Sequence, residues 1–420
     1  MISRGLRYKL APTAEQEQVF RQHVGACRLI YNIALEQRQT FSRRRRINFA
    51  TQGIELTQLR KEYDWLAAIS YGCQSYALKD LENAFQRFFA GKSRYPTPRK
   101  RRVNDTCRFK SEDIIFKPYN AKWSAVRLPK IGWVKFRNTR LVKGKVKNAT
   151  LSYEAGGWHI SFACEIEHEA PAPQAESVGI DRGVATTLAL STGEMLSLPD
   201  SLGCLDAQRR RAQRVLSRRK KGSRRRDRQK RRVAYLQARV HRIRRDWHHR
   251  AALDIARRFG VAVLEKLDTK SMTASAKGTA AEPGRNVRQK AGLNRSILNA
   301  GWNTFARILT YKMEERGGQV VIVPAQFTSQ TCTACDVVDA RSRESQARFV
   351  CVSCGHTAHA DINAAINIER RWSTPLLDVE GCGYAPVEAS TVRTITLYGQ
   401  PERVIASGML TEGTGRTGDA

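Results

Sequence analysis

The chain has 420 residues, 41% of them hydrophobic, so it is long enough for two or three domains with ordinary apolar cores. Its 73 Lys and Arg against 39 Asp and Glu give a formal net charge of +34, which exceeds what solubility requires and indicates a polyanionic partner, with nucleic acid as the first candidate. No segment approaches the roughly 20 apolar residues of a membrane span, and residues 1–10 lack the apolar block of a secretion signal, so an intracellular protein is expected.

The first hundred residues predict one strand followed by helices. Alternation in residues 1–10 is typical of a strand, and Thr13 with Gln16 three positions later predicts a capping box that begins a helix. Apolar residues recur at helical spacing to about residue 34, and again from about Thr57 to Ala90. Residues 11–96 are therefore expected to form a small helical module.

Residues 97–172 change to short alternating runs separated by turn residues, a pattern that predicts an antiparallel sheet or small barrel. Pro96 and Pro98 end the helices before it. The strand in residues 1–10 is expected to pair into this sheet, which makes the helical module an insertion. A Pro- and Ala-rich linker ends the region near residue 176.

From Ser177 the pattern becomes α/β. Expected elements are three strands, a long helix, the strand 261–265, a polar stretch, a helix at 299–316, a strand at 319–325 and a closing helix at 358–371. The polar stretch, Thr269 to Asn299, is interpreted either as a lid or as a disordered loop. Residues 372–420 are rich in Gly, Thr and Ser without a clear period, which predicts a disordered tail.

Four cysteines have the spacing of a zinc ribbon, C-x2-C, a gap of 15 residues, and C-x2-C. Four thiolates complete a tetrahedron and leave no open position, so the predicted zinc is structural; the alternative is four free thiols in loops. The predicted ligands are Cys332, Cys335, Cys351 and Cys354. Six other cysteines are scattered and are interpreted as ordinary thiols: Cys27, Cys73, Cys107, Cys164, Cys204 and Cys382.

Three acidic residues lie in apolar segments, Asp181 and Glu265 at predicted strand ends and Asp361 in the first turn of a predicted helix. Singly, each has a simpler explanation, because Asp361 would stabilise a helix N-terminus and the other two would be ordinary strand-end charges. Together they are what two-metal phosphodiester hydrolysis requires, since converging carboxylates repel one another unless they hold two Mg²⁺ ions, about 3.5 to 4 Å apart. The hypothesis is a nuclease.

The basic charge concentrates in one helical region. From Gln208 to Arg250, 20 of 43 residues are Lys or Arg and two are acidic, while apolar residues recur at alternating intervals of three and four. We expect one face to pack and the others to contact phosphates, the alternative being a solvated charged helix. Two smaller basic clusters, 42–48 and 98–104, are either backbone contacts or mobile loops.

These features resemble the TnpB proteins of bacterial insertion sequences, which are relatives of type V CRISPR effectors. The resemblance covers about residues 1–371. It departs from the family pattern at Arg182, where a smaller or apolar residue is usual, and at Ala360, where arginine is frequent. The segments that carry it are GIDRGVATTLAL, VLEKL, TSQTCTACD, FVCVSCGHTAHADINAAINI, LPKIGWVKF and LSRRKKGSRRRDRQKRRV.

The resemblance implies an RNA-guided DNA endonuclease with a multi-domain α+β fold. Its partners would be a guide RNA encoded by the element and double-stranded target DNA, in the bacterial cytoplasm at the nucleoid. Asp181, Glu265 and Asp361 would be catalytic and bind two Mg²⁺, beside one structural Zn²⁺. The implied domains are a wedge-like β-barrel (1–10 and 97–172), an inserted helical recognition module (11–96), a RuvC-like, RNase H-like nuclease domain (177–326 and 358–371) and a zinc ribbon (327–357).

Two other functions are weighed against this one. An RNA-guided DNA-binding repressor that does not cut is expected to have lost catalytic acids, whereas all three persist here. A non-enzymatic zinc-ribbon RNA-binding protein would explain the charge and the cysteines and leave the three carboxylates as coincidence.

Overall fold

The computed structural model describes residues 1–41, 47–101, 103, 105–279 and 282–373. Most of the basic cluster 42–48 and all of the predicted tail beyond residue 373 lie outside the described residues. Within the described part, no helix is both long and apolar enough to cross a membrane.

The N-terminal sheet has seven antiparallel strands in the order β2-β6-β7-β1-β5-β4-β3. Strand β1 pairs with β7 and β5, so the expected pairing of the opening strand is confirmed. Phe116 of the edge strand β3 contacts Phe162 of β7 with ring centroids 4.9 Å apart, which shows that the sheet is strongly curved. The strands are β1 (Ile2–Ala11), β2 (Thr106–Lys110), β3 (Ile115–Asn120), β4 (Trp123–Leu128), β5 (Gly132–Arg137), β6 (Lys145–Glu154) and β7 (Gly157–Ile166).

Between β1 and β2 the described residues form four helices: α1 (Ala14–Phe41), α2 (Phe49–Glu62), α3 (Asp64–Ala67) and α4 (Tyr71–Phe89). The expected helical region 57–90 is thus three helices, and the first begins earlier, at an Asn48–Thr51 capping box. The break before α4 is stabilised by Arg60, whose guanidinium donates to the carbonyls of Leu66 and Ile69 at 2.8 and 2.9 Å. A side chain thus satisfies carbonyls that a continuing helix would bond.

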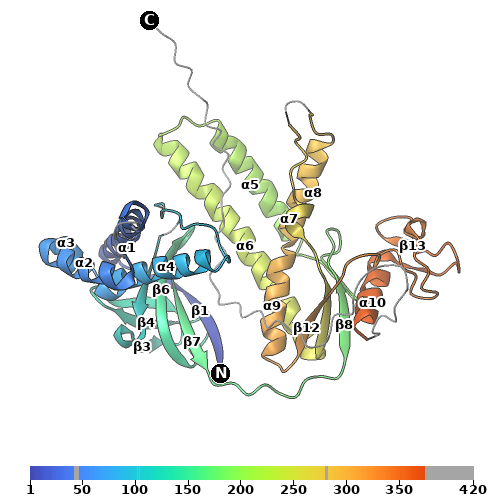
Figure 1. The fold of residues 1–420 in the computed structure, drawn as a ribbon, viewed down its shortest axis with the longest axis horizontal. Coiled ribbons are helices and arrows are strands. Elements are labelled where there is room, and N and C mark those ends of the chain that lie inside the picture. The colour runs from blue at the N-terminus through green and yellow to red at the C-terminus, as the bar shows by residue number, and fades with distance from the viewer. Residues whose placement is uncertain (42–46, 102, 104, 280–281, 374–420) are drawn as a thin grey trace, which may run out of the picture. The chain divides into compact units, whose positions relative to one another are not determined.

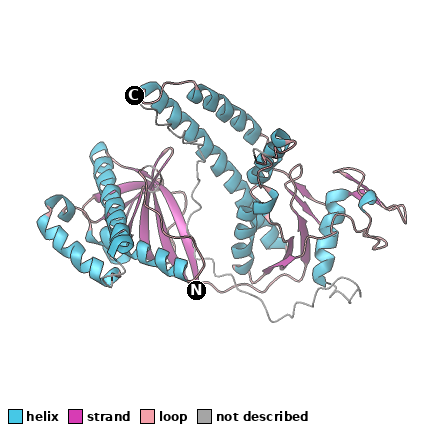
Figure 2. Cartoon of the chain, turned by 45° about the horizontal axis from the view of Figure 1, so that its top comes forward, coloured by secondary structure: helices cyan, strands magenta, loops and turns pink. Residues whose placement is uncertain are grey.

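The second sheet has five strands in the order β10-β9-β8-β11-β12. Strands β8 and β12 of this sheet are labelled in Figure 1, and Figure 2 draws its strands in magenta. Strands β8, β9 and β10 form an antiparallel meander, whereas β11 and β12 run parallel to β8. The strands are β8 (Ser177–Asp181), β9 (Leu188–Leu190), β10 (Met195–Leu196), β11 (Val261–Glu265) and β12 (Gln319–Val323). Helix α10 (Ala360–Ser373) packs on β8, and a Cβ at Gly179 would lie 2.0 Å from the Ala365 carbonyl, so glycine there permits the approach.

The long basic helix predicted after this meander is an antiparallel hairpin of α5 (Ser201–Ser217) and α6 (Arg224–Arg258), side by side in Figure 1. The turn contains Gly222 at φ +82°, a backbone conformation that favours glycine. Arg226 stabilises it by donating to the carbonyls of Leu216 and Arg219 at 2.7 and 2.9 Å. The chain therefore reverses direction, and the two basic helices pack against each other through Leu205, Ala212, Leu236 and Val240.

The polar stretch 269–299 contains helices, so its interpretation as a disordered loop is wrong, whereas its interpretation as a lid stays a prediction. It contains α7 (Thr269–Met272) and most of α8 (Val287–Ala300), joined by a loop whose residues 280–281 are not described. Lys290 and Asn294 of α8 donate to the carbonyls of Met272 and Thr273 at 2.8 and 2.9 Å. Gly301, at φ +70°, then separates α8 from α9 (Trp302–Glu314).

Candidate active site and metal centre

The four predicted cysteines come together in the structure. All their sulfur atoms lie within 4.8 Å of one another, with Cys332 Sγ 3.7 Å from Cys354 Sγ and Cys335 Sγ 3.5 Å from Cys351 Sγ. Backbone amides point at two of the sulfurs, Ala334 N at Cys332 and Cys354 N at Cys351. Hydrogen bonding by the Cys354 amide lowers the pKa of Cys351 to about 6, whereas at Cys335 the Val337 amide lowers the pKa but hydrogen bonds with the neighbouring thiols raise it to about 12, so the four thiols share their protons unequally when no metal is bound. Both turns therefore fit the chemistry of a zinc site with four thiolate ligands.

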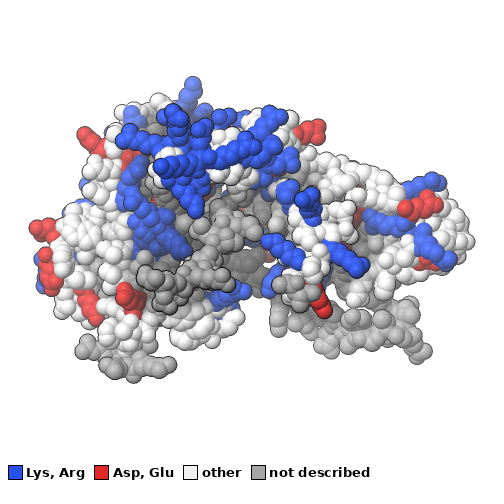
Figure 3. Space-filling model, turned by 90° about the horizontal axis from the view of Figure 1, so that it is seen from above, with Lys and Arg blue, Asp and Glu red and all other residues white. Residues whose placement is uncertain are grey.

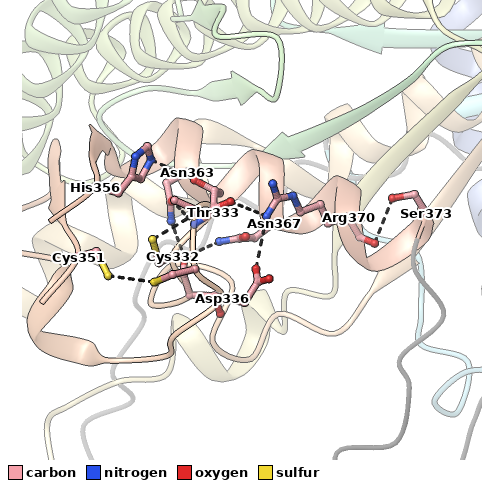
Figure 4. A network of polar contacts seen from close by, with 12 residues as sticks. Cys332, Thr333, Asp336, Cys351, His356, Asn363, Asn367, Arg370 and Ser373 are labelled. Carbon is pink, nitrogen blue, oxygen red and sulfur yellow. Dashed lines mark hydrogen bonds and ion pairs between the residues drawn. The ribbon is translucent and has the colours of Figure 1, made fainter. Parts of the chain in front are cut away.

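Helix α10 anchors this cysteine group (Figure 4). Asn363 accepts from the amide of Thr333 at 3.2 Å and donates to the Thr331 carbonyl at 2.8 Å. Arg370, two turns further along the helix, donates to the Thr333 carbonyl at 2.7 Å. Buried Ala360, the first residue of α10, packs with Cys332, Phe349 and Cys351. The start of α10, where Asp361 lies, is thus tied directly to the cysteine group.

Two of the three predicted acids lie at the C-terminal ends of neighbouring strands of the second sheet, and the third lies at the start of the helix that packs on that sheet. Asp181 and Glu265 end two neighbouring parallel strands whose preceding residues, Ile180 and Leu264, are paired in register. The carboxyl groups of Asp181 and Glu265 are hydrogen bonded to each other. Asp361 lies in the first turn of α10, the helix that packs on β8, as the sequence predicts. Glu265 and Asp361 are buried and Asp181 is half-buried.

Charge crowding alters the acidity of this group. Burial, followed by the nearby charges of Glu265 and Asp361, raises the pKa of Asp181 to about 7. Burial also raises the pKa of Glu265, although the charge of Arg182 opposes that rise. Three carboxylates this close in a dry site are costly to ionise together, so the site as built favours either a bound proton or a cation. An oxygen-only donor set is the type that Mg²⁺ prefers.

Two arginines lie beside the three acids. Arg182 was noted from the sequence, whereas Arg343 was not predicted to be part of the site. Arg343, from the segment between the cysteine pairs, donates to Asp361 with Nη2 3.2 Å from Oδ1. Its charge also opposes the raised pKa of Asp181. Arg182, one of the two departures noted from the sequence, is 6% exposed and donates to the backbone carbonyl of Glu265. Arg182 therefore bonds to the backbone at the end of β11, whereas Arg343 forms an ion pair with the carboxylate of Asp361.

The carboxylates are spaced more widely than the cysteines. Among the described residues, only the cysteine group brings three or more metal-binding side chains within 4.8 Å of one another. Asp361 is paired with Arg343 at 3.2 Å. Two ions that share their ligands span a longer distance than one ion does, so this spacing still fits a two-metal site.

Trp302 connects both acid-bearing strand ends. Its indole N–H donates to the carbonyl of Gly183, two residues after Asp181, at 3.1 Å. The ring is 4% exposed and shares a cluster with Ile297, Ala300, Leu267 and Met272, of which Leu267 follows Glu265 by two residues. One buried side chain at the start of α9 therefore holds the segments that follow Asp181 and Glu265.

The α5–α6 hairpin carries the strongest charge of the described surface. Figure 3 shows Lys and Arg covering the face over which these helices lie. Exposed cations on α6 include Arg224, Arg225, Arg228, Lys230, Arg231 and Arg232. Ion pairs within the hairpin, such as Arg209 with Asp206, use few of them because acids are scarce there. This surface fits a phosphate backbone.

Three family models match the chain. They are described as a "Probable transposase" (residues 161–276), a "Cas12f1-like, TNB domain" (302–368) and a "Helix-turn-helix domain" (1–46). In the structure the last range holds strand β1 and helix α1 up to residue 41. The "TNB" match includes all four cysteines, Arg343 and Asp361.

Full-length relatives agree with these models. The chain is 37% identical over 367 residues to the "Putative RNA-guided DNA endonuclease InsQ" of Escherichia coli (strain K12), covering 86% of this chain and 90% of that protein. A "Putative RNA-guided DNA endonuclease" of Streptomyces pristinaespiralis is 29% identical, with 87% and 89% covered. Among solved structures, a Cas12f1 chain in complex with sgRNA and target DNA aligns with a TM-score of 0.55 and 13% identity, covering 88% of this chain and 98% of that one, which supports a shared fold.

Proposed function

The chain belongs to the TnpB/OrfB family of insertion-sequence proteins, and on that premise we propose that it is an RNA-guided DNA endonuclease. The observation that carries the proposal is the meeting of Asp181 and Glu265, as a hydrogen-bonded pair of raised pKa, beside Asp361 at one sheet edge. A structural role would not require two acids to share a buried position. The names of the relatives from Escherichia coli and Streptomyces pristinaespiralis support the same activity.

We assign the second sheet, with α10 packed on it, to a RuvC-like, RNase H-type nuclease domain. The support is its topology, a three-stranded meander followed by two strands parallel to the first, together with the fold shared with the Cas12f1 chain. The curved N-terminal sheet is proposed as a barrel that, with its inserted helices, holds nucleic acid. The domain limits remain those predicted from the sequence, 1–10 with 97–172, 11–96, 177–326 with 358–371, and 327–357.

Asp181, Glu265 and Asp361 are proposed to hold two Mg²⁺ ions, and the four cysteines one Zn²⁺. When bound, a pair of Mg²⁺ ions supplies an activated water and stabilises the leaving oxygen of the phosphodiester. The four sulfurs saturate a zinc ion, so its part is structural. Through α10 and Ala360, the zinc ribbon would fix the place of Asp361.

The protein side chains contribute charge and exclusion of water. Arg343 is placed to neutralise carboxylate charge at Asp361, and its guanidinium is suited to contact a phosphate that enters beside that carboxylate. Arg182 is buried and holds the end of strand β11 by donating to the backbone carbonyl of Glu265. Trp302 keeps the segments that follow Asp181 and Glu265 in place.

Guide RNA and target DNA are the proposed partners. The net charge of +34 and the basic α5–α6 hairpin provide sequence-independent attraction for both backbones. Base pairing would then select the target, as in other RNA-guided effectors.

The test is to purify the protein with the RNA that accompanies it and to incubate this complex with a plasmid library in Mg²⁺. We expect cleavage beside a short shared motif, and no cleavage by the Asp181→Ala variant. Equal cutting by wild type and variant would refute the assigned site. Target binding by the wild type without any cutting would instead establish the repressor.

A further inference from the structure

Four aromatic side chains meet at the C-terminal end of α4 and in the loop that follows. We call Phe85, Phe88, Phe89 and Tyr95 the aromatic cluster. The ring centroids of Phe88 and Phe89 are 5.4 Å apart, and those of Phe88 and Tyr95 are 5.2 Å apart at 80°. Phe85 lies against both Phe89, at 6.0 Å and 25°, and Tyr95, at 5.5 Å and 90°. The rings therefore form one preassembled group.

One ring of the aromatic cluster is buried and two are exposed to solvent. Phe85 is 7% exposed and belongs to the core of the N-terminal region. Phe89 is 77% exposed and Tyr95 is 41% exposed, so most of the Phe89 side chain is open to solvent although it contacts two other rings. The offset stack on Phe85 fixes one side of Phe89 and leaves ring surface free. A large exposed apolar surface held rigidly in this way is typical of a binding site.

The charge around the cluster has one sign. Residues 83–101 contain no acidic residue and six basic ones: Arg87, Lys92, Arg94, Arg99, Lys100 and Arg101. The nearest acids on α4 are already neutralised, Asp80 by Arg99 at 2.8 Å and Glu82 by Arg38 at 2.7 Å. Arg87, Lys92 and Arg94 have exposed side chains next to the rings in sequence. An occupant must therefore present both a flat apolar surface and negative charge.

We propose that the aromatic cluster is a stacking platform for unpaired bases of the guide RNA. A nucleotide is the ligand that combines a π-face with an adjacent phosphate, and aromatic rings flanked by cations are how proteins bind single strands. Bases of duplex DNA are already stacked on their neighbours, whereas RNA is recognised chiefly at loops and ends whose bases are unstacked. The inference rests on the proposed function in that it takes RNA as the resident partner.

The first test measures affinity for the copurified RNA, resynthesised and end-labelled, by fluorescence anisotropy. Phe89→Ala should weaken binding roughly 5-fold to 150-fold, the range for loss of one stacked base. Phe89→Trp should retain affinity because it keeps the π-face. Tyr63→Ala is the matched control, since Tyr63 is a 48% exposed aromatic of the same helical module flanked by Glu62 and Asp64. Melting temperatures should stay unchanged, because Phe89 is so exposed.

The second test locates the base. The same RNA carrying 5-iodouracil is irradiated in complex with the protein, and the crosslinked peptide is identified by mass spectrometry, with a parallel sample in which the target DNA carries the label. A crosslink from RNA to the peptide containing Phe88, Phe89 or Tyr95 is expected. A crosslink from DNA alone, or less than a 2-fold affinity loss in Phe89→Ala, would overturn the inference. Wild-type protein that binds no RNA would overturn the proposed function as well, which distinguishes the two failures.

Discussion

Arg343 reaches out of the segment between the two cysteine pairs and donates to Asp361 at 3.2 Å, so the cysteine group supplies a cation to the acidic site. Asp361 is held close to the cysteine group as well, because the preceding residue, Ala360, packs against Cys332 and Cys351. The cysteine group and Asp361 are therefore connected directly at the start of α10.

Replacing Arg343 with alanine should lower the cleavage rate on the order of 100-fold, the scale for losing one charge-stabilising donor in a nuclease site. RNA and DNA affinity should change little, because the basic surface elsewhere provides most phosphate contacts. Single-turnover cleavage and filter binding measure the two quantities. Arg341→Ala is the control, since Arg341 lies in the same turn, has an 80% exposed side chain and pairs only locally with Asp339. Equal rates for both variants would show that Arg343 has no special part.

Asp181 should make stability depend on pH when divalent cations are absent. Its pKa is raised to about 7, so the folded state keeps a proton that the unfolded chain releases near pH 4, and this contribution to stability is lost as pH rises from about 4 through 7. Asp181→Asn should therefore raise the melting temperature more at pH 8 than at pH 5, and leave it nearly unchanged below pH 4. Thermal scans in Mg²⁺-free buffer test this, and added Mg²⁺ should stabilise the wild type alone. A pH-independent difference would contradict the shifted pKa.

Cys332→Ser should lower both the melting temperature and the zinc content, because it removes one of four ligands from a site whose binding energy is also folding energy. Cleavage should fall with them, since Asp361 is held by the same packing. Elemental analysis and thermal scans are the measurements. Cys204→Ser, which changes an exposed thiol of α5, is the matched control. Normal zinc content in Cys332→Ser would argue against the four-cysteine centre.

Trp302→Phe should raise the Mg²⁺ concentration needed for half-maximal cleavage while leaving guide and target affinity unchanged. The ring packing is largely kept, but the 3.1 Å bond to the Gly183 carbonyl, two residues after Asp181, is lost. Trp158→Phe is a suitable control, because Trp158 is buried and its indole N–H has no hydrogen-bond partner among the described residues. If the two variants respond to Mg²⁺ alike, Trp302 has only a packing role.

Replacing Arg228 and Arg232 with alanine should make RNA binding less sensitive to salt. Each phosphate contact that is lost reduces the slope of log affinity against log salt by about 0.7 for a single strand and 0.9 for a duplex. Anisotropy titrations between low and physiological salt measure this slope. A slope that is already flat in the wild type would contradict the binding surface assigned to the α5–α6 hairpin.

Local patterns predicted the parts of the site that depend on spacing. The apolar runs that precede Asp181 and Glu265 predicted both strand ends, and the spacing of the two C-x2-C pairs predicted the cysteine group. The place of Asp361 in a first helical turn followed in the same way. Each of these features is encoded in a short stretch of sequence, the longest being the 23 residues from Cys332 to Cys354, so no contact between distant segments was needed.

Features that depend on tertiary contacts were not predictable. The break between α3 and α4 is stabilised by Arg60 of α2, which donates to the carbonyls of Leu66 and Ile69, and nothing in the sequence marks this arginine as the side chain that will do so. Helix α8 was expected as polar loop because Gly292 and several polar residues obscure its period, while Ile297 is buried through contacts with a cluster that includes Trp302 and Leu267. Arg343 looked like any arginine in a basic chain, since only the fold brings it to Asp361.

The central claim is that Asp181, Glu265 and Asp361 act together as the cutting site. The most direct measurement compares single-turnover cleavage by the wild-type complex with Asp181→Asn, Glu265→Gln and Asp361→Asn, each loaded with the same RNA and assayed for target binding in parallel. We predict that all three variants bind the target normally and that none cuts it at a measurable rate. Cleavage at the wild-type rate by any one of them would contradict this claim.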